Sequence, residues 1–345
     1  MALLKSNKRT TITGKSLNNK VVNTINIKPK NTKKIINRYH FLIKCRAYIF
    51  ELLKISLGQT DDEMEINLFV QEFLKKKLKN SSNNKIDFEN ELLQLKRGHK
   101  TNDKSREQEL LLLLKFITTE IVDNGGLQRY QQASIMGQQS DRGGDSSKKL
   151  MEWILELSDA GKEIKEMVTL EIGSLRVDNV LSKNKYKKFI KSIERIDLNS
   201  NHPDINKQDF LLREQPKDAS EQFGLISCSL VVNFVPDEYK RGEMLRRLKQ
   251  FCLPDGLVFL VLPLSCVENS RFMTSEILVN KIMHQGLNFK LLKEHKSNKI
   301  VYYLFQNIPS TRVNESYLKK NFDCRKHIDE DSKRKHGKNN FSISF

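Results

Sequence analysis

The sequence predicts an α/β fold, in which helices cover both faces of a mostly parallel β-sheet and an all-helical module precedes it. From residue 149 onward, short apolar runs typical of buried strands alternate with helical patterns, and such alternation produces parallel strands. The last two strand patterns, residues 289–294 and 300–305, have no helix between them, which indicates an antiparallel hairpin at the sheet edge. Before residue 125 the apolar spacing is helical.

Composition limits the partners and the compartment. The 345 residues carry a net charge of +18 with a pI near 9.5, which favours polyanions such as RNA, DNA or an acidic membrane surface. The five cysteines form no C-x-x-C pair, so we expect a reducing compartment and no metal site. We find no apolar run of about eighteen residues and no secretory signal, and therefore expect an intracellular protein without a membrane span.

The first 36 residues form a basic arm. They contain nine Lys and Arg and no acid, and the first acidic residue of the chain is Glu51. Because this segment has little to bury, we expect it to be disordered. It either binds nucleic acid, serves as a nuclear address or is only a solvated tail, and the sequence leaves these alternatives open.

Residues 37–125 are expected to form the helical module. Leucines and aromatics recur at helical spacing, most strongly in the five-leucine block at residues 110–114, and they are expected to form its core. Asn124-Gly125-Gly126 ends the last helix of the module. The expected helices are residues 38–57, 63–79, 87–97 and 105–122.

Between residues 126 and 148 the chain becomes polar and rich in glycine. Asp145, Ser146 and Ser147 are suited to cap the next helix, residues 149–157, which holds the only tryptophan, Trp153. An ordinary capping loop is one interpretation. The amides, the arginine and the paired glycines of Gly137-Gln138 and Arg142-Gly143-Gly144 also favour a loop that closes over a polar ligand.

The strands and helices of the α/β domain, residues 126–308, follow in order. After the first strand we expect a lysine-rich helix that ends near Lys191, and further helices at 238–251 and 274–285. A basic tail, residues 309–345, contains Lys333-Arg334-Lys335, a nuclear or nucleic-acid signal. The expected strands are residues 168–172, 193–198, 209–212, 224–234 and 257–262, and then the hairpin.

The turn at Glu171-Ile172-Gly173-Ser174 is the first candidate binding element. It ends the first strand, where a glycine can adopt a positive φ and allow a ligand to approach the backbone. The N–H groups at the start of the expected following helix would also serve a polar ligand. Many α/β proteins contain such a turn and bind nothing there, so its meaning depends on the strands that follow.

Three further residues fit a nucleoside. Asp197 ends the second strand, 24 positions after Gly173, close to the spacing at which a carboxylate accepts hydrogen bonds from both ribose hydroxyls. Asp209 and Phe210 are placed to receive an adenine amino group and to cover its ring. No G-x-G-x-x-G fingerprint and no P-loop are present, so a nucleoside without phosphates, such as S-adenosylmethionine, fits better than a dinucleotide.

The expected strand order, the Glu-x-Gly turn and the Leu253-Pro254-Asp255-Gly256 turn resemble the Rossmann-like, seven-stranded class I S-adenosylmethionine-dependent methyltransferases. More specifically, residues 126–308 resemble the fungal 25S rRNA adenine-N1 methyltransferase family, which is related to an animal S-adenosylmethionine sensor upstream of the TOR complex. The segments that carry this resemblance are Ala133-Ser134-x-x-Gly137-Gln138, residues 142–148 and residues 229–236.

This resemblance implies S-adenosylmethionine as cofactor, bound at Gly173 and Asp197, and methylation of one adenine of large-subunit rRNA in the nucleus and nucleolus. Asn233-Phe234-Val235-Pro236 departs from the Asn/Asp-Pro-Pro-aromatic motif of amino-group adenine methyltransferases. Asn233 is expected to hydrogen-bond a flipped adenine and Phe234 to stack on it, with ordinary strand-end packing as the alternative.

Two other functions remain open at this point: a non-catalytic S-adenosylmethionine sensor, and a nucleic-acid-binding scaffold with a degenerate pocket. The net charge favours the enzyme, because a sensor has no need of two basic tails. The sequence identifies neither the modified adenine nor the form of the substrate, naked rRNA or pre-ribosome, and it gives no oligomeric state.

Overall fold

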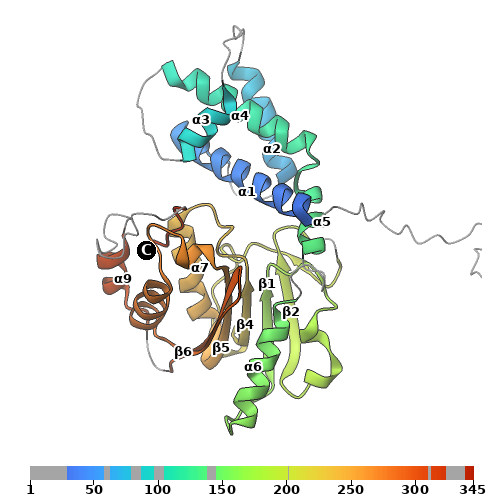
Figure 1. The fold of residues 1–345 in the computed structure, drawn as a ribbon, viewed down its shortest axis with the longest axis vertical. Helices are drawn as coiled ribbons and strands as arrows, with labels where there is room; N and C mark the ends of the chain where they lie inside the picture. The colour runs from blue at the N-terminus through green and yellow to red at the C-terminus, as the bar shows by residue number, and fades with distance from the viewer. Residues whose placement is uncertain are drawn as a thin grey trace, which may run out of the picture.

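The computed structural model describes residues 29–57, 63–78, 87–96, 105–137, 145–200, 202–309, 312–323 and 339–345. Five helices form a module at one end of a seven-stranded sheet that has helices on both faces (Figure 1). No helix in these ranges is long and apolar enough to cross a membrane. The same ranges contain no group of three or more His, Cys, Asp or Glu arranged to hold a metal ion.

The helical module is built around one apolar cluster. Leu42 and Ile49 of α1 pack with Val70 of α2 and with Leu114 and Ile117 of α4, and all five side chains are buried. The helical spacing seen in the sequence produces this cluster, because residues three and four apart share a helix face. The helices of the module are α1 (Pro29–Leu52), α2 (Glu63–Lys77), α3 (Phe88–Lys96), α4 (Ser105–Asp123) and α5 (Gly126–Gly137).

The sheet has the order β3-β2-β1-β4-β5-β7-β6, with parallel pairing from β3 to β5 and antiparallel pairing of β7 with β5 and β6. The strand order reverses beside β1, where β2 lies on one side and β4 on the other. The expected antiparallel edge hairpin is confirmed. The strands are β1 (Met167–Ile172), β2 (Ile190–Asp197), β3 (Asn206–Lys207), β4 (Phe223–Ser229), β5 (Cys252–Pro263), β6 (Phe289–Lys296) and β7 (Ile300–Asn307).

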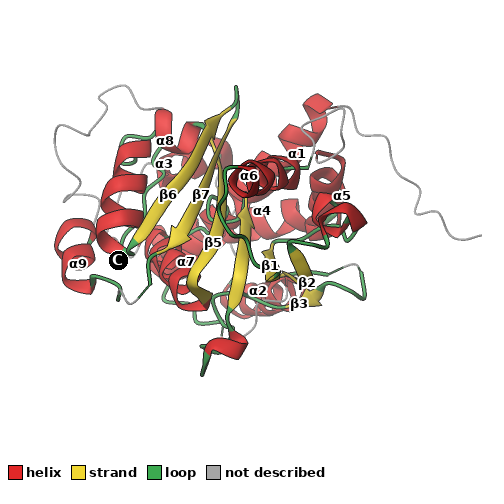
Figure 2. Cartoon of the chain, turned by 90° about the horizontal axis from the view of Figure 1, so that it is seen from below, coloured by secondary structure: helices red, strands yellow, loops and turns green. Residues whose placement is uncertain are grey.

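Side chains that alternate along the central strands pack into two separate cores, one on each face of the sheet. Leu257, Phe259 and Val261 of β5 pack on the face covered by α6 (Ser147–Asp159). Val258 and Leu260 pack on the opposite face, under α7 (Glu238–Phe251) and the π-helix η4 (Ile277–Gly286). Figure 2 shows α6 and α7 on opposite sides of the sheet. Continuous apolar runs therefore mark strands that are buried on both faces.

The helical module sits over the carboxyl ends of the central strands (Figure 1). Lys44 of α1 donates a hydrogen bond to the carbonyl oxygen of Asn233 at 3.3 Å. Gln131 of α5 donates to the carbonyl oxygen of Asn199, just beyond β2, at 2.5 Å. Two helices of the module thus contact the edge of the sheet at which parallel strands form ligand sites.

Several expected elements differ in the structure. No α-helix follows Gly173; residues 180–182 and 184–186 form single 3₁₀ turns instead. Asn179 and Ser182 explain this, because their side chains bond to Glu171 and to the carbonyl of Val177, and such local polar bonds compete with a helix. The polar stretch expected to be a loop begins with the helix α5, which packs against α1 and buries Ala133 and Met136.

Two strand predictions were also wrong in their limits. The third strand is residues 206–207, and residues 209–212 form the turn after it, because the Asp209 side chain accepts a hydrogen bond from the N–H of Leu211. The fourth strand ends at Ser229 rather than residue 234. Leu230 has φ of 58°, a left-handed conformation that interrupts an extended strand.

The two predicted tails are partly folded. Helix α1 begins at Pro29, inside the expected basic arm, while residues 1–28 lie outside the described ranges. The expected C-terminal tail contains α9 (Glu315–Phe322) and ends in a buried segment, residues 339–345, with Ile343 fully buried. Arg241 of α7 donates to the carbonyl of Ser342 at 2.6 Å, which helps to hold this segment. Lys333-Arg334-Lys335 lies outside the described residues.

Gly242 lies where the C-terminal segment packs against α7. A Cβ at this position would lie 1.9 Å from the carbonyl oxygen of Ser344, so only glycine lets the C-terminal segment reach α7. We expect Gly242→Ala to lower the free energy of unfolding of the full chain by about 2 kcal/mol or more. In a chain that ends at residue 338 the same change should stabilise α7 by about 1 kcal/mol, since alanine is the better helix former. Chemical denaturation of the four proteins tests this change of sign; a loss of stability in both backgrounds would contradict it.

Candidate cofactor and base site

The candidate site lies at the carboxyl ends of β1, β2 and β4, where the strand order reverses. Gly173 follows β1 with φ of +73°, and its N–H and that of Ser174 both donate to the carbonyl oxygen of Ile196, at 2.8 and 3.1 Å. A Cβ on Gly173 would lie 2.5 Å from Cγ2 of Val231, in the loop after β4. The glycine therefore lets β1, β2 and that loop meet at one point.

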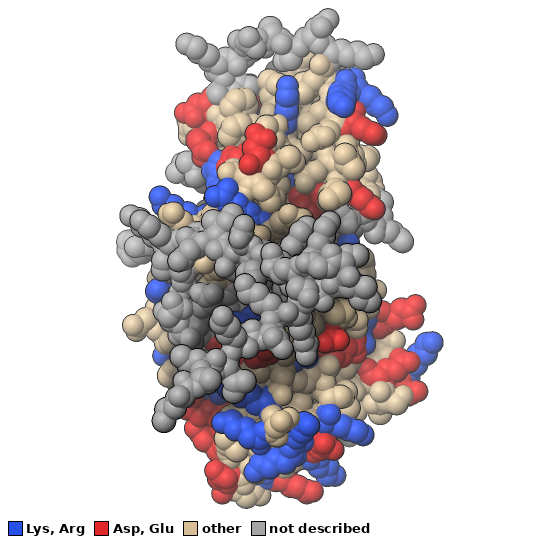
Figure 3. Space-filling view, turned by 90° about the vertical axis from the view of Figure 1, so that its right-hand side faces the viewer, with Lys and Arg blue, Asp and Glu red and all other residues tan. Residues whose placement is uncertain are grey.

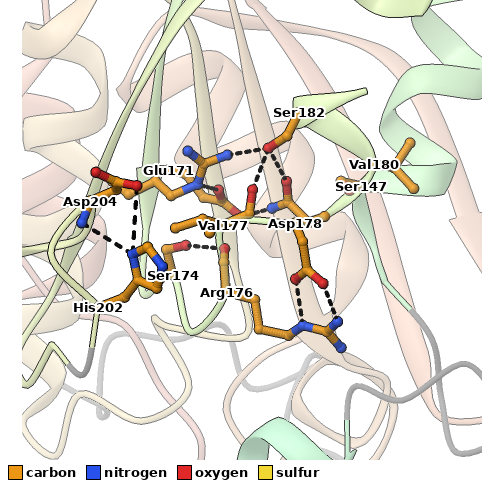
Figure 4. Close-up of polar contacts among 12 residues, drawn as sticks. Ser147, Glu171, Ser174, Arg176, Val177, Asp178, Val180, Ser182, His202 and Asp204 are labelled. Atoms are coloured by element: carbon orange, nitrogen blue, oxygen red, sulfur yellow. Dashed lines mark hydrogen bonds and ion pairs between the residues drawn. The ribbon is translucent and has the colours of Figure 1, made fainter. Parts of the chain in front are cut away.

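Glu171 is held by protein partners. Its carboxylate accepts hydrogen bonds from Asn179 at 2.6 Å and from Arg195 at 3.0 Å, among the contacts drawn in Figure 4. Burial raises the pKa of Glu171, while Arg195 and Asn179 oppose that rise. Both carboxylate oxygens thus have partners. In this arrangement Glu171 fixes the loop after β1.

Ser174 was expected to contribute through a helix N-terminus. The residue is buried, and its Oγ donates to the carbonyl oxygen of Arg176 at 3.1 Å (Figure 4). Since no α-helix starts here and the N–H of Ser174 bonds to Ile196, the structure offers no bundle of free N–H groups at this turn. Ser174 shapes the turn that Gly173 begins.

Asp145 is a tightly bound part of the glycine-rich loop. One carboxylate oxygen accepts bonds from the N–H and Oγ of Ser147, at 2.9 and 2.5 Å, and the other accepts from the N–H of Val180 at 2.6 Å. Ser146 and Ser229 share a hydrogen bond of 2.8 Å. The end of the loop is therefore tied to the start of α6, to the segment after β1 and to the end of β4. Gln138 and Arg142-Gly143-Gly144 lie outside the described residues.

Asp197 has the environment expected of a ribose acceptor. Within the described chain its half-buried carboxylate accepts one hydrogen bond, from the N–H of Asn199 at 2.9 Å. Burial raises the pKa of Asp197 to about 6, and the bond from Asn199 opposes the rise. The spare acceptor sites match two hydroxyl donors, and such bonds would offset the desolvation of the carboxylate. The chemistry of this position fits a ribose.

Asp209 and Phe210 lie further from that role. Oδ1 of Asp209 closes the turn through the N–H of Leu211 at 2.8 Å. Phe210 is only 2% exposed, with its ring centroid 5.2 Å from that of Phe251 and the guanidinium of Arg247 5.6 Å from its centre. Its ring belongs to the core under α7, and it would have to leave that core to cover an adenine.

The loop after β4 places Asn233 and Phe234 at the same edge. Asn233 is 7% exposed, and its Oδ1 has no hydrogen-bond partner among the described residues. Phe234 is half-buried and stacks on His40 of α1. The strained Leu230 begins this loop, and Val231 meets Gly173. Backbone strain often occurs where a side chain must be held for function.

Sequence reasoning missed an aromatic cluster that joins α1 and α5 to this loop. It consists of Tyr39, His40, Tyr130 and Phe234. Burial raises the pKa of Tyr130 to about 12, and Asp197 contributes to that rise, so the cluster lies near the acid that ends β2. The aromatic residues of α1 have the same helical spacing as core residues, and no local motif distinguishes them.

Solved methyltransferases are among the matching structures, all at low identity. NodS, an N-methyltransferase from Bradyrhizobium japonicum WM9 in complex with S-adenosyl-L-homocysteine, is 14% identical with a TM-score of 0.33, over 46% of this chain and 86% of that one. An S-adenosylmethionine-dependent methyltransferase from Clostridium acetobutylicum is 12% identical with a TM-score of 0.38, over 52% and 99% of the two chains.

Two yeast relatives match most of the chain. The 25S rRNA (adenine(2142)-N(1))-methyltransferase of Saccharomyces cerevisiae is 37% identical over 295 residues, 81% of this chain and 84% of that protein. The 25S rRNA adenine-N(1) methyltransferase of Schizosaccharomyces pombe is 38% identical over 240 residues, 67% and 80% of the two. The family model described as 25S rRNA (adenine(2142)-N(1))-methyltransferase, Bmt2, matches residues 115–343, and the chain belongs to this family.

Proposed function

We propose that this protein transfers the methyl group of S-adenosylmethionine to N1 of one adenine in large-subunit rRNA. The observation that carries the proposal is Asp197, a half-buried carboxylate with spare acceptor sites beside the Gly173 turn, in a member of this family. The same proposal takes the nucleolus as the place of action and ribosome biogenesis as the process, because the substrate is made there.

The residues at the strand ends have different roles in binding the cofactor. Asp197 would receive the ribose hydroxyls of the cofactor, and Gly173 keeps the β1 turn close to Val231 and the β4 loop. Bound S-adenosylmethionine supplies a methyl group on a positively charged sulfur. Glu171 and Asp145 hold the surrounding loops through their own partners, so these loops are fixed before any ligand arrives.

The reaction mainly requires that N1 of the adenine is aligned with the methyl group of the cofactor. With S-adenosylmethionine bound, the lone pair of adenine N1 would take its methyl group, so that S-adenosylhomocysteine would leave and the positive charge would pass to the base. No proton must be removed, so a general base is not required. Asn233 and Phe234 would hold the base: Oδ1 of Asn233 accepts from the adenine amino group, and the ring of Phe234 supports its face.

Exposed lysines offer a surface for the rRNA backbone. Figure 3 shows Lys and Arg gathered at the lower end of the face that it presents. Between β1 and β2, Lys185 and Lys188 lie over the rings of Tyr186 and Phe189, each 4.7 Å from the centroid, which holds the side chains at the surface. Such charges bind phosphates without reading sequence. The exposed lysines of this segment are Lys183, Lys185, Lys187, Lys188 and Lys191.

Methyl transfer to RNA in vitro tests the proposed function. The purified chain is incubated with S-adenosylmethionine labelled in the methyl group and with total RNA from Saccharomyces cerevisiae lacking its own relative. We expect label in 25S rRNA alone, recovered as 1-methyladenosine after digestion to nucleosides. Tight cofactor binding without transfer to any RNA would instead favour a sensor.

Asn233→Ala separates base alignment from cofactor binding. We expect the rate of transfer at saturating RNA to fall about 10- to 100-fold, since one base contact is worth about 1–3 kcal/mol. Cofactor affinity should stay the same, because Asp197 and Gly173 are untouched. The free energy of unfolding should stay the same or rise slightly, since Oδ1 of Asn233 is buried without a hydrogen-bond partner among the described residues. Single-turnover kinetics measure the transfer rate, and cofactor titration measures the affinity. A loss of cofactor affinity as large as the loss of rate would contradict the base-binding role of Asn233.

A further inference from the structure

One face of the Phe234 ring, which is proposed to support the base, is covered by a side chain of the helical module. The imidazole ring of His40 lies with its centroid 3.8 Å from that of Phe234, at an interplanar angle of 12°. This is the face-to-face geometry in which a flipped base lies on an aromatic side chain. His40 therefore stands where an unpaired base would lie.

Two buried polar atoms beside this stack have no hydrogen-bond partner in the part of the chain that the structure describes. Nε2 of His40 and Oδ1 of Asn233 make no hydrogen bond to any described residue, and both are buried. Asn233 as a whole is 93% buried, since 7% of its surface is exposed. Native interiors leave few such atoms, and each costs free energy until it finds a partner. If the stack were a permanent core contact, we would not expect an unpaired polar atom on the ring of His40 and a second one on Asn233, the residue next to Phe234.

The imidazole is neutral in this position. Burial, with the charge of Lys44 adding to it, lowers the pKa of His40 to about 3. The rings of Tyr130 and His40 pack edge to face, with their centroids 4.7 Å apart. Lys44 donates a hydrogen bond to the carbonyl oxygen of Asn233 at 3.3 Å. A flat, uncharged, nitrogen-containing ring, held between aromatic side chains, resembles a nucleobase in shape and polarity.

We propose that His40 occupies the place of the target adenine until RNA arrives, so that the base and His40 compete for the same face of Phe234. This inference rests on the proposed function. Base binding would move α1 away from the loop, return Nε2 of His40 to water and give Oδ1 of Asn233 a donor in the adenine amino group. Guanine carries an acceptor at that position, which would face Oδ1 without a bond and be rejected.

Substitution of His40 tests the competition in two directions. His40→Ala removes the competitor, so the KM for RNA should fall about 3- to 10-fold while kcat and cofactor affinity stay the same. His40→Phe keeps a stacking ring without the unpaired nitrogen, so the KM should rise by a similar factor. Asn37→Ala, an exposed position of the same helix, is the matched control and should change nothing. Thermal unfolding confirms that each variant is folded.

An increase in KM or a fall in kcat for His40→Ala would overturn the proposal, because His40 would then be a base-binding residue. Unchanged KM in both variants would overturn it as well. Binding of a fluorescent single-stranded fragment of 25S rRNA that contains the target adenine, measured without cofactor, keeps the test independent of catalysis. If the wild type methylates no RNA, the proposed function fails, while tighter binding of this fragment by His40→Ala would still support the competition.

Discussion

Asp197→Asn is expected to make the protein more stable and to weaken its binding of the cofactor. The carboxylate of Asp197 is desolvated in the folded chain, which raises its pKa from 3.8 to about 6. An amide carries no charge to desolvate, so the variant should gain about 1–2 kcal/mol in free energy of unfolding at pH 7. It also offers a weaker acceptor to the ribose, and we expect cofactor affinity to fall about 10- to 100-fold.

The pH dependence follows from the same shift. A carboxyl whose folded-state pKa lies above its ordinary value destabilises the fold above about pH 6, and this penalty disappears as the pH falls toward 3.8. The stability difference between Asp197→Asn and the wild type should therefore shrink from pH 7 to pH 4. Cofactor affinity of the wild type should decrease about fivefold between pH 6 and pH 5, because the protonated acid must ionise to bind both hydroxyls.

Asp204→Asn is the matched control for this pair of effects. Asp204 lies in the turn after β2, and 74% of its side chain is exposed, so its removal changes the net charge equally without changing the site. Denaturation curves and cofactor titration from pH 4 to pH 8 measure all three proteins. A destabilised Asp197→Asn, or one with full cofactor affinity, would contradict the role given to this acid.

Gly173→Ala is expected to remove cofactor binding by a different route. The new Cβ would lie 2.5 Å from Cγ2 of Val231, closer than carbon atoms can pack, and the residue would also be held at φ of +73°. The β1 turn and the β4 loop must then separate. We expect cofactor affinity to fall more than tenfold and the free energy of unfolding to fall by about 2–3 kcal/mol.

Two controls separate the clash from the backbone strain. Gly161 has φ of +82°, and no atom lies within 4 Å of the position that a Cβ would take there, so Gly161→Ala carries the strain alone and should leave cofactor binding intact. Val231→Ala should restore part of the affinity when combined with Gly173→Ala, because it removes the atom that clashes. Calorimetric cofactor titration of this double-mutant cycle is the measurement. Strict additivity of the two substitutions would show that the contact is not the cause.

The ends of strands β1 and β2 could be predicted from the sequence because their signals are local. A glycine after a buried run and an acid at the end of the next run fix the two backbone positions that the topology brings together. The parallel part of the sheet followed from the alternation of elements, and the hairpin from the missing helix. Phe210 shows the limit of such reasoning: its aromatic character was evident, yet its burial under α7 depends on Phe251 and Arg247, which lie far along the chain.

The other half of the site depends on contacts that no local pattern records. His40 and Lys44 lie nearly two hundred residues before the loop that they contact. Their spacing on α1 matches that of ordinary core and surface positions. The missing helix after Gly173 has a similar cause, because Asp145, from another loop, bonds to Val180 and favours a short turn there. This contact from another loop acts together with the local bonds of Asn179 and Ser182.

Methylation of a defined adenine in cells tests the central claim most directly. The chain is expressed in Saccharomyces cerevisiae that lacks its own relative. Mass spectrometry of the excised fragment then measures 1-methyladenosine at position 2142 of 25S rRNA, the adenine that the name of that relative gives. We predict that the wild type restores near-complete modification at this adenine and that Asp197→Asn and Gly173→Ala do not, although Asp204→Asn and Gly161→Ala do. Full restoration by Asp197→Asn, or no modification by a folded wild-type protein that binds the cofactor, would contradict the account.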